Sequence, residues 1–478
     1  MKNHNFGKFF NKTSLYLIIS IVFSITATFI TSPGIFFPDS YVRWSYAHMI
    51  FSGEIQGLVV WLAIVPSVIM AFFYWLGSNY AFFTLIQSWS FIFSSLLVLD
   101  KVIGQKKVSW ILLLLFLNPI TVCYSVFVET GVYCLTGINL LILLFVWLRK
   151  KNGLQAWQYI AIFFFCLFAS YVIVGFRPNA ISIIPLLLLC CLYCCSKNRK
   201  LWNGWLLSGL GIISGFLLAI NTFQILNITA LNSSSAGLVW EMLSTVNMIS
   251  SSEEKRNYED YLDDFIGEGT TKAALEINSQ DNENVVVFFG SFPLVVMGDP
   301  QNSKLIIGKY LTLMLDIPGT FLKNKLYFTG RTLGVQQPLR NLEYGHDEPD
   351  KFEQFGIIET SKRSGWINCF NLFMQNFPIF RIPVFWFVAA LLLLISSKFL
   401  LKDKTELSFW LYLLACFYYG AFIINNQSFE FRYFFPSFQL LYIIVIVHVY
   451  KLIRWLLRIC PSLIKLIKKI STHLRTLE

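Results

Sequence analysis

The chain has 478 residues, of which 56% are hydrophobic, 17% are aromatic and only 14% are charged. Soluble globular proteins carry about 25% charged residues, so this composition excludes a soluble enzyme, a disordered scaffold and a nucleic-acid binder built on a basic domain. The formal net charge is +11. In a membrane protein the positions of the basic residues along the chain are more informative than their total, because they indicate which loops are cytoplasmic.

Apolar runs close to the roughly 20 residues that cross a bilayer recur along the chain. Ten of them are interpreted as spans: 13–33, 80–99, 108–124, 131–148, 157–175, 180–195, 202–223, 380–400, 407–424 and 434–450. The first lacks a small-residue cleavage site, so we expect a retained anchor and not a signal peptide. The sequence therefore predicts an all-α polytopic membrane protein with about ten transmembrane helices.

The distribution of lysine and arginine predicts the orientation of these helices. Basic residues fill the short loops on the side of the N-terminus and the tail after residue 450, whereas the opposite short loops hold only Arg43, Arg177, Arg381 and Arg432. The positive-inside rule then places both termini in the cytoplasm. A further apolar run at 57–76 would upset this alternation if it crossed. We interpret it as a re-entrant or juxtamembrane helix on the outer face.

These assignments divide the chain into four parts. Residues 1–223 are expected to form a seven-span core with an outer loop at 34–79, and residues 224–378 a mostly helical outer domain of net negative charge. Residues 379–450 supply three further spans. Residues 451–478 form a basic amphipathic tail suited to anionic headgroups on the cytoplasmic side.

The candidate site consists of charged residues at the outer ends of the spans. Asp39 follows the first span, Glu129 lies between the third and fourth, Arg177 between the fifth and sixth, and Arg432 between the ninth and tenth. Ionisable groups beside the hydrocarbon region are costly, which makes them candidates for function. Taken singly, Asp39 also suits a helix cap, Glu129 a solvated loop residue and the two arginines headgroup anchors. Taken together, they favour a site.

The chemistry of such a set is specific. A carboxylate can accept a proton from a sugar hydroxyl, and guanidiniums can bind a phosphate and stabilise it as a leaving group. These roles fit inverting glycosyl transfer from a lipid-phosphate sugar. The absence of HExxH, Walker A and GxGxxG patterns argues against a metalloprotease and an ATP-driven pump.

Several short motifs resemble those of GT-C glycosyltransferases, the polytopic enzymes that use polyprenyl-phosphate sugars. The segment D-S-Y-V-R-W-S-Y-A at 39–47, followed by I-F-S-G at 50–53, is similar to the family's first-loop motif. Arg177-Pro178 resembles the basic residue before a proline-containing span, and R-Y-F-F-P at 432–436 resembles a late Arg-Tyr-x-x-Pro element. The arrangement of spans is similar to that of serotype-converting O-antigen glucosyltransferases.

The resemblance implies roles for individual residues. Asp39 would be the catalytic base and Glu129 a second catalytic acid, while substrate would contact Arg43, Arg177, Arg432, Arg331, Tyr41 and Trp44. The resemblance also implies that the enzyme transfers a hexose, which would be glucose, from undecaprenyl phosphate. The acceptor would be the O-antigen of lipopolysaccharide or another lipid-linked or polymeric glycan. The reaction would occur on the periplasmic face of a bacterial inner membrane. No cofactor is expected. The first loop has a single acid next to the membrane, where some relatives have a pair, and this argues against a metal-dependent mechanism.

Two other functions stay open. An O-antigen polymerase also has many spans, a large outer loop and outer arginines, but it does not need an acid directly after the first span. A lipid-linked oligosaccharide flippase or other transporter would place charges within the spans near the midplane, and the predicted spans carry almost none. Both readings are weaker than a transferase, and a non-enzymatic scaffold is weaker still.

Overall fold

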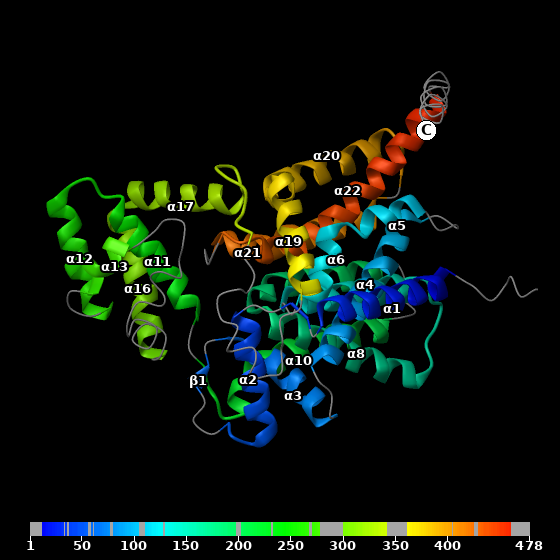
Figure 1. Cartoon of the computed structure of the whole chain (residues 1–478), viewed down its shortest axis with the longest axis horizontal. Coiled ribbons are helices and arrows are strands. Elements are labelled where there is room, and N and C mark those ends of the chain that lie inside the picture. The colour runs from blue at the N-terminus through cyan, green and yellow to red at the C-terminus, as the bar shows by residue number, and fades with distance from the viewer. Residues whose placement is uncertain are drawn as a thin grey trace, which may run out of the picture.

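The computed structural model describes residues 12–32, 34–35, 38–55, 59–60, 62–76, 80–104, 110–127, 130–196, 202–230, 233–266, 270–277, 300–341, 361–403, 405–424 and 429–459. Within these residues the chain is almost wholly helical (Figure 1). The exceptions are two strands of two residues each, β1 (Val59–Val60) and β2 (Thr229–Ala230), which pair in parallel. The predicted all-α class therefore describes this part of the chain.

Seven of the described helices are long and apolar enough to cross a membrane, which makes this a multi-pass membrane protein. They are α1 (Lys12–Thr31), α4 (Tyr80–Ile103), α7 (Thr130–Leu148), α8 (Ala156–Phe176), α10 (Trp202–Ile225), α21 (Glu406–Ile424) and α22 (Phe431–Ile459). Each coincides with a run that the sequence predicts to span.

The predicted count of about ten is not confirmed, because the other three runs form shorter helices. Residues 180–195 fall in η2 (Pro178–Ile183) and α9 (Ile184–Ser196), and residues 380–400 fall in η4 (Pro378–Arg381) and α20 (Pro383–Phe399). The run 108–124 is divided into α5 (Trp110–Phe116) and α6 (Pro119–Val126).

The break between α5 and α6 has a local cause. The side-chain oxygen of Asn118 accepts hydrogen bonds from the backbone N–H groups of Ile120 (2.8 Å) and Thr121 (3.0 Å), and Pro119 occupies the first turn of α6. An asparagine cap followed by proline starts a new helix and ends the old one. The run predicted to span at this position is therefore built from two helices.

One end of the bundle is held together by ion pairs among residues next to the predicted cytoplasmic loops. Lys12 contacts Asp100 at 2.7 Å, Lys451 contacts Asp403 at 2.6 Å, and Arg149 contacts Glu406 at 2.8 Å. The first pair joins the start of α1 to the end of α4. The second joins the last part of α22 to the loop before α21, and the third joins the end of α7 to the start of α21. Neighbouring helices therefore alternate in direction, as successive spans must.

The segment between α1 and α4 folds into two helices outside the set of long apolar ones. These are α2 (Pro38–Ser52) and α3 (Val65–Trp75), joined by stacking of Trp44 on Tyr74 with ring centroids 4.3 Å apart. With 11 residues, α3 is about 16 Å long, which is too short to cross a bilayer. Its length fits the prediction that 57–76 does not cross.

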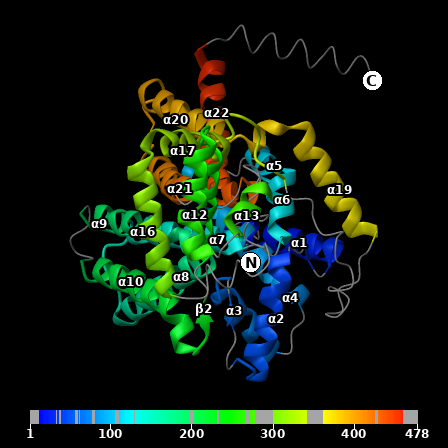
Figure 2. The ribbon, with the colours of Figure 1, turned by 90° about the vertical axis from the view of Figure 1, so that its left-hand side faces the viewer.

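Most of the predicted outer domain that the structure describes forms a helical unit beside the bundle (Figure 1 and Figure 2). It consists of α11 (Ser233–Asn247), α12 (Ser252–Ile266), α13 (Thr270–Ile277), α16 (Pro300–Asp316) and α17 (Pro318–Thr332). The last two are bent by 110° at a short break before Pro318. The remaining helix, α19 (Ser361–Asn376), packs against α1 and α6 instead.

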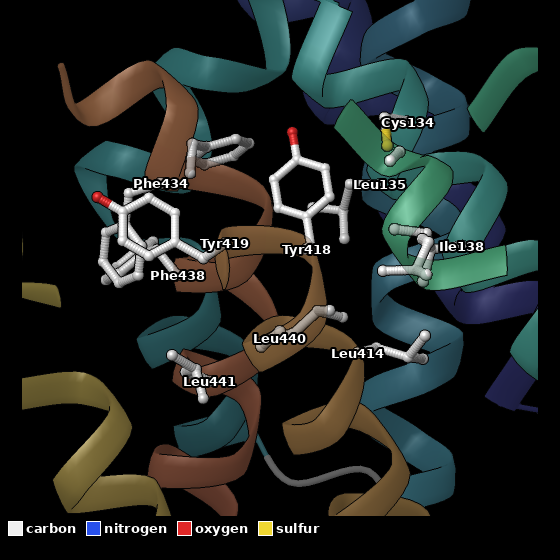
Figure 3. Close-up of a cluster of buried hydrophobic side chains, with 14 of the residues drawn as sticks. Cys134, Leu135, Ile138, Leu414, Tyr418, Tyr419, Phe434, Phe438, Leu440 and Leu441 are labelled. Atoms are coloured by element: carbon white, nitrogen blue, oxygen red, sulfur yellow. The ribbon is translucent and has the colours of Figure 1, made fainter. Parts of the chain in front are cut away.

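The interior of the bundle is aromatic and close-packed. Figure 3 shows Tyr419 of α21 beside Phe434 of α22, with ring centroids 4.9 Å apart, and Tyr418 of α21 on the side of Leu135 of α7. Elsewhere, α8 and α10 approach closely at the glycines of α10, because a Cβ added at Gly215 would lie 2.1 Å from the carbonyl oxygen of Leu167. Small residues allow this approach between membrane helices.

Candidate functional site

Asp39 is positioned by a contact between the ends of two helices. The backbone N–H of Ile35, just after α1, donates to the carbonyl of Val126 at 3.1 Å, and Ile35 forms a parallel β-bridge with Phe127. The side-chain amide of Gln87 in α4 donates to the carbonyls of Ser125 and Phe127 on the same segment. These bonds attach the end of α1 to the end of α6, and Asp39 follows in the first turn of α2.

Two arginines from opposite ends of the sequence converge on Asp39. Nη1 of Arg432 donates to Oδ2 of Asp39 at 3.1 Å, and Nη2 of Arg43 lies 3.8 Å from the same oxygen. Arg43 is four residues after Asp39, so one turn of α2 brings its side chain back beside the carboxylate. The side chain of Asp39 is 20% exposed, against 6% for Arg43 and 12% for Arg432.

Arg432 also binds two neighbours at the start of α22. Its Nε lies 2.6 Å from Oε2 of Glu430, and its Nη2 donates to the hydroxyl of Tyr433 at 3.1 Å. Glu430 is almost fully buried, with 4% of its side chain exposed. All three nitrogens of this guanidinium therefore face an oxygen of the protein.

Arg177 completes the arrangement from the turn between α8 and η2. Its guanidinium carbon lies 5.0 Å from the centre of the Tyr433 ring, and that of Arg432 lies 4.9 Å from the same centre. Pro178 starts η2 directly after Arg177, and the N–H of Ala180 donates to the Arg177 carbonyl at 2.8 Å. The group is called the Asp39 cluster below: Asp39, Arg43, Arg177, Glu430, Arg432 and Tyr433.

The Asp39 cluster holds three guanidiniums and two carboxylates, which leaves one positive charge in excess. Burial acts to raise the pKa of Asp39, but Arg432, Arg43 and Arg177 outweigh it and hold the pKa below its ordinary value. Asp39 is therefore a carboxylate at neutral pH. Burial lowers the pKa of Arg43 and Arg177, yet a guanidinium starts so high that both stay charged.

Arg43 has hydrogen-bonding capacity that the described residues do not use. Its Nε and Nη1 are buried and make no hydrogen bond to any residue that the structure describes. A buried charged donor without an acceptor is costly, and an anion bound beside it would remove that cost. This arrangement suits binding of a phosphate or carboxylate.

The remaining predicted residues lie around the cluster in different ways. Trp44 is 5% exposed and packs between Tyr74 and Tyr80, and Tyr41 is half-buried on the same helix. The guanidinium carbon of Arg331 lies 5.2 Å from the ring of Phe429, the residue before Glu430. Arg331 thus adjoins the segment that carries Arg432, while Trp44 contacts two tyrosines.

Glu129 lies outside the described residues. The described residue closest to it on the C-terminal side is Thr130, followed by Gly131, which lies against α22. A Cβ added at Gly131 would be 3.2 Å from Cγ of Pro436 and 3.7 Å from the carbonyl oxygen of Arg432. The start of α7 is therefore next to the Asp39 cluster.

Sequence reasoning missed Glu430 and Tyr433 as members of the site. In the segment E-F-R-Y, Glu430 lies two residues before Arg432 and Tyr433 directly after it. An acid so close to a predicted phosphate-binding arginine was the available signal. It also missed how the outer domain reaches the site. The backbone of Arg340 pairs with this segment, donating to the Phe429 carbonyl at 2.8 Å and accepting from the Phe431 N–H at 3.0 Å.

Among the residues that the structure describes, no group of three or more histidine, cysteine, aspartate and glutamate side chains is arranged to hold a metal ion. The acids of the Asp39 cluster face guanidiniums. The chain matches no protein-family model, and comparisons with curated proteins and with solved structures find no significant match.

Proposed function

We propose that the protein is an inverting membrane glycosyltransferase that moves a hexose from a polyprenyl-phosphate donor to a surface glycan. The observation that carries the proposal is the meeting of Asp39 with Arg43, Arg177 and Arg432, which come from three widely separated parts of the chain. A carboxylate next to an excess of guanidiniums supplies the two groups that this reaction needs.

The guanidiniums would hold the donor phosphate. Arg43 has two buried N–H groups without a hydrogen-bond acceptor among the described residues, and Arg177 and Arg432 lie over one tyrosine ring within the same cluster. Guanidinium–phosphate hydrogen bonds are strong and directional. They become stronger as the phosphate gains charge on leaving, which is the condition for stabilising the transition state.

The carboxylate of Asp39 would act as the base. An acceptor hydroxyl gives its proton to Asp39 while its oxygen forms a bond to the anomeric carbon of the hexose. The bond between that carbon and the phosphate oxygen breaks, and the lipid phosphate leaves with the electron pair. The products are an inverted glycoside, a protonated Asp39 and a lipid phosphate with one more negative charge.

The proposed topology follows from the two ends of the bundle. The Asp39 cluster lies at the end opposite the Lys12–Asp100 and Lys451–Asp403 pairs. We assign the basic end to the cytoplasm and the Asp39 end to the periplasm of a bacterial inner membrane. In this assignment the three shorter helical segments (α5 with α6, η2 with α9, and η4 with α20) also cross, which gives ten crossings. Glu129, directly before α7 in the sequence, would orient the acceptor.

An O-antigen polymerase is the second candidate, and one observation favours it. Arg331 and Arg340 of the outer domain both contact the segment that carries Arg432, through the ring of Phe429 and through backbone pairing. A polymerase would use such outer-domain arginines to hold a second lipid-linked glycan.

An assay with purified protein in lipid nanodiscs separates these candidates. A panel of radiolabelled polyprenyl-phosphate hexoses would be offered with a lipid-linked glycan acceptor, and the products would be resolved by chain length. Transfer of a single hexose supports the transferase. Joining of repeat units without any hexosyl transfer would contradict it and support the polymerase.

A further inference from the structure

The nitrogens of Arg432 already contact protein oxygens in the structure. Nη1 faces Asp39, Nε faces Glu430, and Nη2 faces the hydroxyl of Tyr433. A guanidinium carries five N–H groups, so an anion could bind Arg432 alone without displacing a partner. An anion that binds Arg432 and Arg43 together, however, takes the position of Oδ2 of Asp39, because this oxygen lies next to both guanidiniums. Of the two carboxylates, Glu430 is closer, at 2.6 Å, and only 4% exposed, whereas Asp39 is at 3.1 Å and 20% exposed. Asp39 is the partner that a ligand displaces more easily.

Arg43 is next to the atom that would be displaced. Its Nη2 lies 3.8 Å from Oδ2 of Asp39, the same oxygen that accepts from Arg432. Its Nε and Nη1 are buried and have no hydrogen-bond acceptor among the described residues. An anion that takes the place of the Asp39 oxygen would meet N–H groups of both arginines.

We propose that a lipid-linked phosphate competes with the Asp39 carboxylate for Arg432 and Arg43, so that binding of the phosphate releases Asp39. The identity of the ligand rests on the proposed function, whereas the competition rests on the shared hydrogen-bond donors. The phosphate would thus prepare the base that its own transfer reaction requires.

The charges that face Asp39 determine how this competition depends on pH. They are Arg43 on the same helix, Arg432 at the start of α22 and Arg177 after α8. Further titratable groups lie beside these arginines: Glu430 and Tyr433 beside Arg432, Tyr80 beside Arg43, and Tyr418 beside Arg177, with Tyr133 next to Tyr80. The arginines hold the pKa of Asp39 below its ordinary value. An anion bound to them cancels part of that effect, so the pKa of Asp39 rises in the complex. Binding and proton uptake are then linked, and affinity increases as pH falls.

The test is binding of a short dialkyl phosphate to the full-length protein in nanodiscs, measured by calorimetry between pH 5 and 8. This probe keeps a single negative charge throughout, so any pH dependence belongs to the protein. Wild-type affinity should increase toward pH 5, by at most about tenfold per pH unit for one linked proton. Asp39→Asn should bind more tightly than wild type at pH 8, by about tenfold or more, and should lose the pH dependence.

The matched control is Asp403→Asn, because Asp403 also pairs with a cation, Lys451 at 2.6 Å, but at the opposite end of the bundle. Its affinity and pH profile should equal those of wild type. Equal or weaker binding by Asp39→Asn at pH 8, in a sample that is monodisperse and melts cooperatively, would overturn the proposal. So would the same gain in Glu430→Gln without a gain in Asp39→Asn.

The outcomes for the two proposals are distinguishable. If the competition is observed but no hexosyl transfer occurs with any donor, the proposed function fails while the anion linkage stands. If wild type and Asp39→Asn both fail to bind the probe, the cluster is not a phosphate site and the inference is overturned.

Discussion

Arg432 shows at the scale of a single residue how the site is assembled. Its guanidinium joins Asp39, which follows the first span, to Glu430 and Tyr433 beside the last one. The sequence predicts Asp39, Arg43, Arg177 and Arg432 as outer-face charges because each lies next to an apolar run. It does not predict which of them touch, because a contact between residues 39 and 432 depends on the packing of all the helices between them.

Replacing Arg432 or Arg177 with lysine tests whether the planar guanidinium matters. Lysine keeps the charge but loses the fork that binds two oxygens at once, so hexosyl transfer should fall by about tenfold or more at either position. The measurement is the initial rate in the nanodisc assay. Arg381→Lys is the control, because that side chain donates to the carbonyl of Leu339 at 3.0 Å and has no described contact with the Asp39 cluster. Full activity of both Arg432→Lys and Arg177→Lys would place the phosphate elsewhere, with Arg331 and Arg340 the next candidates.

The helices themselves show which features a sequence pattern can predict. Long apolar runs such as those of α4 and α7 are recognisable without a structure, since length and hydropathy suffice. The separation of α5 from α6 was missed because the apolar run continues through Asn118 and Pro119, although this pair is a capping signal. The outer domain was not predictable, because its docking depends on distant contacts such as Arg340 with Phe429.

The close packing of α8 on α10 predicts opposite effects for two glycines of the same helix. Gly215→Ala would place a Cβ 2.1 Å from the carbonyl oxygen of Leu167, so the helices must separate, at a cost of about 1–3 kcal/mol. Gly209→Ala has its nearest neighbour at 3.9 Å and should melt at or above the wild-type temperature, since alanine favours the helix. Thermal unfolding in detergent measures both. A Gly215→Ala protein as stable as Gly209→Ala would show that the two helices are not packed as described.

A buried ion pair joins two helices of the outer domain, α11 and α17, next to the end of α21. Lys325 of α17 lies 2.9 Å from Oε2 of Glu241, whose side chain is 1% exposed, and it also donates to the carbonyl of Ile424 at the end of α21. Lys325→Met leaves that carboxylate without its cation, so the free energy of unfolding should fall by roughly 3 kcal/mol. This is the lower end of the range for breaking a buried ion pair, and we expect it because the Lys325 side chain is 24% exposed. The double variant Lys325→Met with Glu241→Gln should regain part of the loss, because no unpaired charge is left. Unfolding of the double variant at a lower temperature than the single one would contradict this account.

At the scale of the whole molecule, the two ends of the helix bundle differ in charge. Lysines paired with acids occupy one end, and the arginine-rich Asp39 cluster occupies the other. The distribution of basic residues along the sequence predicts this separation, because alternate loops differ in charge.

Cysteine labelling tests the proposed orientation. In a Cys369→Ser background, which removes the one cysteine that is exposed among those the structure describes, Ser52→Cys at the end of α2 should react with a membrane-impermeant maleimide in intact spheroplasts. Lys402→Cys, in the exposed turn before α21, should react only after permeabilisation. Labelling of both positions from the same side would undo the assignment of the site to the outer face.

The central claim is that Asp39 is the base of a hexosyl transfer reaction, and the rate of the Asp39→Asn protein tests it most directly. Asparagine keeps the size of the side chain but accepts no proton, so the rate should fall by about 10²–10⁴-fold. The same substitution should strengthen binding of the dialkyl phosphate, which separates loss of the base from loss of the site. Glu129→Gln should reduce the rate less, and Asp403→Asn should leave it unchanged. An Asp39→Asn protein that transfers hexose at the wild-type rate would contradict the mechanism.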